Sequence, residues 1–338
     1  MKFLAQYIYQ LLLHTNNGIL EKFLLLARKL ILKISNPIIT LSYNNIKLAM
    51  PFSHTLPLNQ KIYPTYDMQL HSIAHHIYTK DGKLNMIDVG ANIGDTAVLT
   101  NMPNASYLLI EGEKSYANLI KTNISYNFHK ATIRDISMGG GHNKNLPLNP
   151  AEALPLFIIS HTFLGDNDEQ SAYTISLQDG SGKLINDKHN YSSVQIQTLD
   201  SVVSKADFSP NFIKIDTDGF DFKVLRGAFK TLTYFKPTIF FEWDKNHLQA
   251  QNEDFLSIFP SLNKLGYEQL LIFDNFGVLL CVLQSDDCNN LKLLMDYTQD
   301  SRQNIYYYDI LTFHKDSSFK LTEWLKARKT ESKNLTDV

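Results

Sequence analysis

The chain has 338 residues, of which 44% are hydrophobic and 20% are charged, and its formal net charge is −2. This length suits a single enlarged α/β domain with a sizeable core. A protein that grips nucleic acid would need a clearly basic domain, so we do not expect a nucleic-acid partner. Two cysteines are too few for a disulfide scaffold, and we expect a cytoplasmic protein.

The first 34 residues predict two apolar helical segments. Residues 3–13 are apolar apart from Gln6 and Gln10, and this run is too short to span a bilayer. Residues 19–34 place on one helical face Leu20, Phe23, Leu24, Ala27, Leu30, Ile31 and Ile34. We expect this helix to pack on its own domain or on a second subunit; the alternative is peripheral contact of residues 1–34 with the inner face of a membrane.

Residues 1–65 are predicted to form an N-terminal helical extension, and the core to begin at residue 66. A helix is expected over 66–80, followed by alternating strands and helices at 85–89, 95–101, 106–111, 114–127 and 131–136. Such alternation predicts a mostly parallel sheet with helices on both faces. Ligands of such sheets bind at the carboxyl ends of the strands.

The segment DVGANIGDTA at 88–97 is the most informative stretch of the chain. It reads as a strand, a glycine turn and a helix start, which lets the backbone approach a nucleotide-like ligand. Gly90 and Gly94 supply the turn, and Asp95 or Thr96 is expected to cap the helix. A purely structural turn is the alternative.

An acidic residue follows at the distance expected for a ribose ligand. Glu111 ends the strand at 106–111 and lies 111 − 88 = 23 positions after Asp88. The loop lacks the three glycines in register that a dinucleotide pyrophosphate needs. The spacing therefore favours a phosphate-free nucleoside such as S-adenosylmethionine over a nicotinamide cofactor.

The second half predicts an insertion and then further sheet strands. Residues 139–192 interrupt the alternation, with strand-like pieces at 155–160 and 172–177, and we expect a hairpin-bearing substrate-side insertion over the site. The expected strands and hairpin that follow are at 212–216, 238–241, 268–273 with 278–283, and 305–313. The expected helices run through Val224, Leu225 and Ala228 and over 253–265, and a C-terminal helix and tail occupies 316–338.

Carboxylates follow several of these strands. Besides Asp88 and Glu111, the pairs are Asp216 with Asp218 and Glu242 with Asp244. Asp216, Asp218 and Gly219 also suit a simple turn. We nevertheless expect a ligand or catalytic role, because clustered carboxylates at strand ends raise one another's pKa.

Five segments together resemble the FkbM-type methyltransferases: DVGANIGDTA (88–97), LIEGE (109–113), TLDSV (198–202), FIKIDTDGFDFKVLRGA (212–228) and IFFEWD (239–244). The resemblance covers residues 66–315. It implies a class I, Rossmann-like methyltransferase fold and S-adenosylmethionine-dependent methylation of oxygen. It also implies a hydroxyl acceptor on a sugar of a surface polysaccharide or glycan.

The resemblance assigns roles by position. It implies cofactor binding for Asp88, Gly90, Asn92, Gly94 and Glu111, and a place beside the reacting methyl for Asp216 and Gly219. For adenine we expect Asp135 and Ser137. Two positions depart from the family pattern: Asp218 replaces a glutamate, and Gly112 replaces a proline without expected consequence.

Asp216 or Asp218 is the expected base for the acceptor's proton, or a ligand of a divalent metal such as magnesium. Glu242 and His161 are expected to bind substrate, and His161 and His54 are rival bases. Three alternatives stay open: a natural-product or protein acceptor, a non-catalytic cofactor-binding partner, and a nicotinamide-dependent oxidoreductase.

Overall fold

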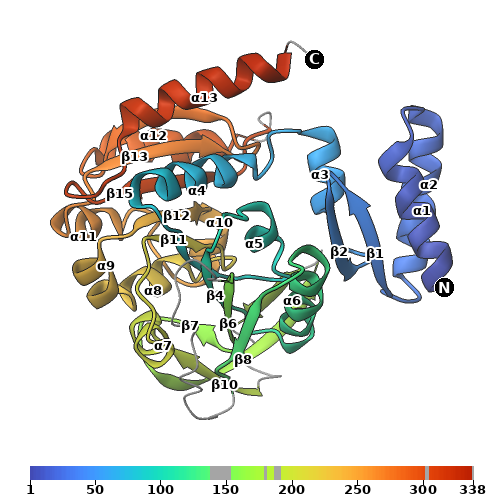
Figure 1. Ribbon diagram of the computed structural model, residues 1–338, viewed down its shortest axis with the longest axis horizontal. Helices are drawn as coiled ribbons and strands as arrows, with labels where there is room; N and C mark the ends of the chain where they lie inside the picture. The colour runs from blue at the N-terminus through green and yellow to red at the C-terminus, as the bar shows by residue number, and fades with distance from the viewer. Residues whose placement is uncertain (138–153, 179–180, 186–191, 301–303, 337–338) are drawn as a thin grey trace.

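The fold is described from a computed structural model covering residues 1–137, 154–178, 181–185, 192–300 and 304–336. A nine-stranded sheet forms its centre (Figure 1). From one edge to the other its strands are β5 (Thr132–Asp135), β6 (Leu156–Ser160), β4 (Ser106–Ile110), β3 (Asn85–Val89), β11 (Phe212–Ile215), β12 (Thr238–Trp243), β15 (Tyr308–Phe313), β13 (Gln269–Asp274) and β14 (Leu279–Gln284).

The six strands from β5 to β12 are parallel, whereas β15, β13 and β14 are joined by antiparallel pairings. This confirms the mostly parallel sheet. The carboxyl ends of β3, β4, β11 and β12 therefore meet at one edge, which is where a parallel sheet binds its ligands.

Helices cover both faces of this sheet, as predicted. Met86 of β3 belongs to one apolar core and its neighbour Ile87 to the other, because side chains alternate along a strand. The first core includes residues of α4 (Met68–Asp81), α5 (Asp95–Leu99), α6 (Lys114–Asn127) and α13 (Leu321–Thr336). The second includes residues of α7 (Leu199–Ala206), α8 (Asp221–Arg226), α9 (Phe229–Phe235), α10 (Lys245–Ala250), α11 (Phe259–Lys264) and α12 (Cys288–Thr298).

The strand predicted at 155–160 is β6, and its expected place in an insertion hairpin is wrong. It runs parallel to β4 and β5 inside the central sheet, since its apolar residues Phe157–Ile159 are fully buried there. Of the remaining insertion, the described residues form a four-stranded side sheet with the order β7 (Phe163–Leu164), β10 (Ser192–Gln197), β8 (Glu169–Gln178) and β9 (Ser181–Ile185). Residues 138–153, 179–180 and 186–191 of the predicted insertion lie outside the described part.

The N-terminal extension is not wholly helical. Between α2 and α3 (Leu56–Ile62), strands β1 (Ile38–Tyr43) and β2 (Ile46–Pro51) form an antiparallel hairpin. Its two-residue turn is Asn44–Asn45, and both residues have positive φ, which is the geometry asparagine tolerates in tight hairpins.

Two helices precede this hairpin, α1 (Lys2–His14) and α2 (Gly18–Leu32). They form an outer layer at the edge of the molecule, beyond β1 and β2 (Figure 1). None of the described helices is long and apolar enough to cross a bilayer.

Other predicted bounds shift modestly. The helix expected at 253–265 is reduced to α11, and the one expected through Val224 is split into α8 and α9. The C-terminal helix α13 is not a frayed tail over its first turns: Trp324 is fully buried beside Phe273 and Phe319.

Candidate active site

One pocket lies over the carboxyl ends of the central strands. It is lined by the glycine loop after β3, by Glu111 after β4, by Asp216 and Asp218 after β11, and by Glu242 of β12. The segment from His54 to Asn59 and the side sheet close it from other directions. The predicted convergence of the strand ends is therefore present.

The glycine loop is tied to its neighbours through the backbone. The amides of Gly90 and Ala91 both donate to the Ile110 carbonyl, and the Asp216 amide donates to the Val89 carbonyl. Gly90 has φ +76°, and a Cβ there would lie 1.9 Å from the Asp216 carbonyl oxygen. Gly90 is thus required by the close approach of the two strand ends as well as by its backbone conformation.

The helix after this loop begins at Asp95, as predicted, but the residue at the cap position is Gly94, which makes no side-chain cap bond. Gly94 has φ +81°, which favours glycine at this turn. Asp95, expected as a cap, instead lines the pocket within the first helical turn.

Glu111 sits where a ribose acid is expected. It is 7% exposed, its Oε2 accepts from the Asn92 amide at 2.9 Å and its Oε1 from the Glu113 amide at 2.7 Å. Burial raises the pKa of Glu111 to about 7, although these two amides lower it. Each carboxylate oxygen keeps a further lone pair for a ligand hydroxyl on the pocket side.

The position after this acid is shaped by Phe163. A Cβ on Gly112 would lie 2.3 Å from Cδ1 of the Phe163 ring, and both residues line the pocket. The departure from proline at 112 is therefore not neutral, because it leaves room for an aromatic wall beside Glu111.

A buried lysine holds two of the predicted carboxylates. Lys214 of β11 lies with its Nζ 3.5 Å from Asp88 Oδ1 and 3.2 Å from Asp216 Oδ2. Asp88 is fully buried and does not line the pocket, so it acts on the site through its ion pair with Lys214. Burial lowers the pKa of Lys214, but Asp216 and Asp88 outweigh that effect and raise it well above its usual value.

The turn after β11 is held by Asp221, which is 1% exposed and accepts from the Thr217 and Gly219 amides. This leaves the side chains of Asp216 and Asp218 at the pocket. Gly219 has φ +106°, and a Cβ there would lie 2.4 Å from the His247 carbonyl oxygen. Residues 216–221 thus combine a turn with two pocket carboxylates.

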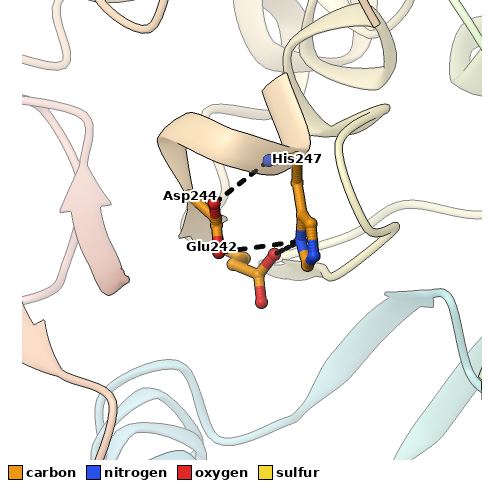
Figure 2. A group of neighbouring side chains, drawn as sticks. All are labelled: Glu242, Asp244 and His247. Atoms are coloured by element: carbon orange, nitrogen blue, oxygen red, sulfur yellow. Dashed lines mark hydrogen bonds and ion pairs between the residues drawn. The ribbon is translucent and has the colours of Figure 1, made fainter. Parts of the chain in front are cut away.

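A second group surrounds His247, which follows Asp244 on α10. His247 Nδ1 lies 3.1 Å from Glu242 Oε1 and 3.8 Å from Asp218 Oδ1 (Figure 2 shows the first pair). Asp244 caps α10 by accepting from the Asn246 and His247 amides. Burial raises the pKa of Glu242 to about 8, although the His247 hydrogen bond lowers it.

Glu242, Asp244 and His247 also place one ligand atom each within 4.8 Å of one another. One nitrogen and two carboxylate ligands suit a borderline metal better than magnesium, which prefers oxygen. Two of these atoms already hydrogen-bond to each other, and Asp244 serves as the helix cap. The geometry is explained without an ion, and a metal requirement stays a prediction.

Three further predicted residues lie outside the pocket lining and close to one another. Asp135, Ser137 and His161 form their own cluster: the His161 amide donates to Ser137 Oγ, and the Ser137 amide donates to Asp135 Oδ1. His161 Nε2 lies 3.7 Å from Asp135 Oδ2. None of the three lines the pocket, so their predicted roles would need contacts beyond its described wall. His54 does line it, but burial lowers its pKa to about 4, which makes it a weak base.

Several pocket residues carry no role in the sequence-based predictions: Tyr66, Asp67, Lys214, Tyr307 and Asp309. The sequence did offer a signal for Lys214, because a lysine within the apolar strand FIKI (212–215) needs a buried partner of opposite charge. Asp309 had one too, as a polar residue before the apolar end of β15. Asp67 had none, since only the fold brings the start of α4 to this edge.

The pocket wall from His54 to Asn59 is held from behind by the N-terminal helices. The Tyr9 hydroxyl donates to the His54 carbonyl, and the Arg28 guanidinium donates to the Phe52 and Ser53 carbonyls. Lys61 Nζ donates to the Leu12 and Thr15 carbonyls at the end of α1. Residues 52–61 therefore contact the pocket on one side and α1 and α2 on the other.

Comparison with known families agrees with this architecture. The profile of the methyltransferase FkbM domain matches residues 88–268, which is more than half of the chain. The chain belongs to this family. The resemblance noted from the sequence is confirmed, and with it the class of S-adenosylmethionine-dependent methyltransferases. The fold is the class I methyltransferase fold.

Similar solved structures share little sequence with this FkbM-family chain. They include methyltransferase FkbM from Methylobacillus flagellatus (13% identity, TM-score 0.33, covering 69% of this chain and 44% of that one). Another is an O-methyltransferase from Bacillus cereus in complex with SAH, with 9% identity and a TM-score of 0.36. The match covers 72% of this chain and 80% of that one. The chain thus spans less than half of the Methylobacillus protein. A search of curated proteins found no match.

S-adenosylmethionine fits the residues of this FkbM-family site. A buried acid, Glu111, can accept hydroxyl hydrogens, and Gly90 brings backbone without a side chain to the pocket. Gly94, also predicted to bind the cofactor, does not line the pocket, and a Cβ there would lie against Ile120. The carboxylates of Asp95 and Asp216 suit a ligand that carries a sulfonium and an ammonium group.

Proposed function

We propose that this protein transfers a methyl group from S-adenosylmethionine to a hydroxyl oxygen of a carbohydrate acceptor, in the synthesis of a surface polysaccharide or another glycan. One observation carries the proposal: a single pocket joins Glu111 and the glycine loop to Asp216, Asp218 and Glu242. A cofactor end and an acid-rich acceptor end are thereby adjacent.

When bound, S-adenosylmethionine supplies an electrophilic methyl group on a good leaving group. The chain then has two tasks, which are to align the acceptor hydroxyl and to receive its proton. The carboxylates after β11 and β12 can do both, because an ionised carboxylate accepts hydrogen bonds from hydroxyl groups.

Glu242 is the strongest candidate for the proton acceptor. Its raised pKa makes its ionised form a better base than an ordinary carboxylate, and His247 can stabilise either form through the hydrogen bond at Nδ1. Asp216 and Asp218, the candidates predicted from the sequence, lie at the same end of the pocket and remain rivals.

The charge of the pocket limits the acceptor. Among the described lining residues, seven carry carboxyl groups, namely Asp67, Asp95, Glu111, Asp216, Asp218, Glu242 and Asp309. Lys214 is the one lysine or arginine in that part of the lining, and it is paired with Asp88 and Asp216. Burial raises the pKa of five of these seven groups, Asp67, Asp95, Glu111, Glu242 and Asp309, so they are not all ionised at once. The carboxylates that are ionised would repel phosphate- or carboxylate-bearing acceptors, whereas neutral or amine-bearing sugars would not be repelled.

The decisive assay uses labelled S-adenosylmethionine with matched neutral, amine-bearing and phosphorylated sugars, and with a protein acceptor. We expect labelled O-methyl product and S-adenosylhomocysteine from the neutral or amine-bearing sugars only. Transfer confined to protein or phosphorylated acceptors would refute the proposal. Tight binding of NAD would indicate the oxidoreductase alternative.

Two further experiments, carboxylate variants and metal removal, test the roles of individual pocket residues. Glu242→Gln should lower kcat by about 10²–10⁴-fold with unchanged cofactor affinity, the range for loss of a general base. If the isolated chain transfers no methyl group, and a biosynthetic complex that contains it keeps normal transfer with Glu242→Gln, Asp216→Asn or Asp218→Asn, the chain would be a non-catalytic partner. Loss of activity in EDTA, restored by one metal, would instead assign Glu242, Asp244 and His247 to a metal site.

A further inference from the structure

The outer surface of α1 and α2 is unusually apolar. Of the 25 large hydrophobic side chains exposed among the described residues, 11 belong to residues 1–34. They are Met1, Phe3, Leu4, Tyr7, Ile19, Leu20, Phe23, Leu25, Leu26, Leu30 and Ile34. A contiguous apolar surface on a folded domain marks an interaction site.

Four of the six exposed large apolar residues of α2 form one ridge. Ile19, Phe23, Leu26 and Leu30 recur at intervals of three and four residues and so share a helical face; Ile19 is 71% and Phe23 66% exposed. The opposite side of α2 carries Leu24 and Ile31, which are buried. The expectation that this helix packs on its own domain therefore holds for one of its faces only.

A row of lysines lies beside this ridge. Lys22, Lys29 and Lys33 are exposed and are spaced by seven and four residues, so they also share a face. Each lies three or four residues from a member of the apolar ridge, which makes the two rows neighbours on the helix surface.

The local charge differs from that of the whole chain. Residues 1–34 hold five basic residues and one acid, a net charge of 5 − 1 = +4, whereas the full chain carries −2. The single acid, Glu21, points to Lys61 of α3 at 3.7 Å and not to the lysine row. The apolar surface thus has a positive border.

We propose that the outer face of α1 and α2 docks on a lipid surface that contains anionic headgroups. The apolar ridge of α2 inserts at the boundary between headgroups and acyl chains, and Lys22, Lys29 and Lys33 contact the headgroup phosphates. A helix with an apolar face and lysines along its border is the form that lies in a membrane interface.

A second copy of the chain is a poorer occupant. A two-fold interface brings the same surface of both copies together, so the lysine rows would face a surface of net positive charge. The one acid of this region is already engaged with Lys61. An anionic lipid surface instead offers headgroup phosphates to the lysine row and acyl chains to the apolar ridge.

The test measures co-sedimentation of the full chain with vesicles of phosphatidylcholine alone and of phosphatidylcholine with phosphatidylglycerol. We expect binding to the anionic vesicles that weakens with salt. Lys22→Gln/Lys29→Gln/Lys33→Gln should bind more than tenfold more weakly, since each lysine near an anionic surface contributes roughly fivefold.

The apolar contribution is tested by Phe23→Asn/Leu26→Asn, which should abolish binding. Its matched control is Leu280→Asn/Leu293→Asn, which changes two leucines of similar exposure on β14 and α12. The control for the lysines is Lys205→Gln/Lys264→Gln/Lys292→Gln, which removes three exposed lysines elsewhere. Thermal melting of each variant verifies folding.

Equal vesicle binding by the α2 variants and their controls would overturn the proposal, as would no binding by the unmodified chain. Sedimentation velocity supplies the other outcome: a dimer that Phe23→Asn/Leu26→Asn converts to a monomer would assign the face to a second copy. Neither readout depends on the methyl acceptor, so this inference can fail or hold independently of the proposed function.

Discussion

The ring of Phe163 fills the space into which a side chain at position 112 would project. A Cβ on Gly112 would lie 2.3 Å from Cδ1 and 2.4 Å from Cε1 of that ring. Both residues border the pocket next to Glu111. The glycine and the aromatic ring therefore form a pair that shapes the wall on the ribose side.

Gly112→Ala should weaken binding of S-adenosylhomocysteine about tenfold, because overpacking of this kind costs about 1–3 kcal/mol. Calorimetry measures the affinity. Gly18→Ala is the control, since a Cβ there meets nothing within 4 Å. Phe163→Ala in the Gly112→Ala background should recover part of the packing, seen as a higher melting temperature; no recovery would show that the ring is not the obstacle.

Glu111→Ala should lower the affinity for S-adenosylhomocysteine by roughly 10–100-fold, the range for hydrogen bonds to a charged group. Glu111→Gln should have a smaller effect, because it keeps an acceptor for the Asn92 or the Glu113 amide. Glu113→Gln serves as the comparison, since Glu113 caps α6 through the Ser115 amide and does not line the pocket. Unchanged affinity in Glu111→Ala would remove the ribose acid from the site.

Lys214→Met should destabilise the fold by about 3–5 kcal/mol, the cost of leaving a buried charge without its partner. The charge at issue is Asp88, which is fully buried. Adding Asp88→Asn should restore much of the loss in urea unfolding. Lys121→Met breaks the more exposed pair with Asp135 and should cost at most about 1 kcal/mol. Equal losses in the two lysine variants would contradict the buried pairing.

Stability of the ligand-free protein should fall as the pH rises from about 4.5 to about 8. Burial raises the pKa of Glu111, Asp67 and Asp221 to about 7 and that of Glu242 to about 8. The folded chain therefore holds more protons than the unfolded chain until those values are passed, and stability is lost as pH rises through them. The lowered pKa of His54 acts in the opposite direction, but only between about 4 and 6.5.

Urea unfolding across this interval checks the sign. Glu242→Gln removes one such group and should flatten the slope by at most about 1.4 kcal/mol per pH unit. The hydrogen bond to His247 can persist in this variant through the amide oxygen. A stability that rises from pH 4.5 to 8 in the unmodified chain would contradict the burial of these acids.

The sequence was sufficient for the central sheet, because strand–helix alternation and the glycine loop are local patterns. It was insufficient for β6, whose apolar run is equally suited to a hairpin and to a buried parallel strand. The β1–β2 hairpin did have a local signal in Asn44–Asn45 between alternating apolar residues, and the prediction of a helical extension overlooked it.

The site shows the same division. Glu111, Asp216, Asp218 and Glu242 were placed at one edge by strand order alone, and they line one pocket. Asp67 arrives through packing of α4, which no spacing along the chain predicts. The roles expected for Asp135 and Ser137 followed strand order with β5 as the third strand, whereas β6 occupies that place beside β4.

The dual contacts of residues 52–61 bear on how this enzyme should be handled in the laboratory. Deletion of α1 and α2 to improve the sample would also remove the hydrogen bonds that Tyr9, Arg28 and the Leu12 carbonyl make with residues 53–61 behind the pocket wall. A shortened chain would then lose activity through displacement of this pocket wall, which is a different cause from loss of the proposed membrane-docking face. Point changes on the outer ridge of α2 keep the two causes apart.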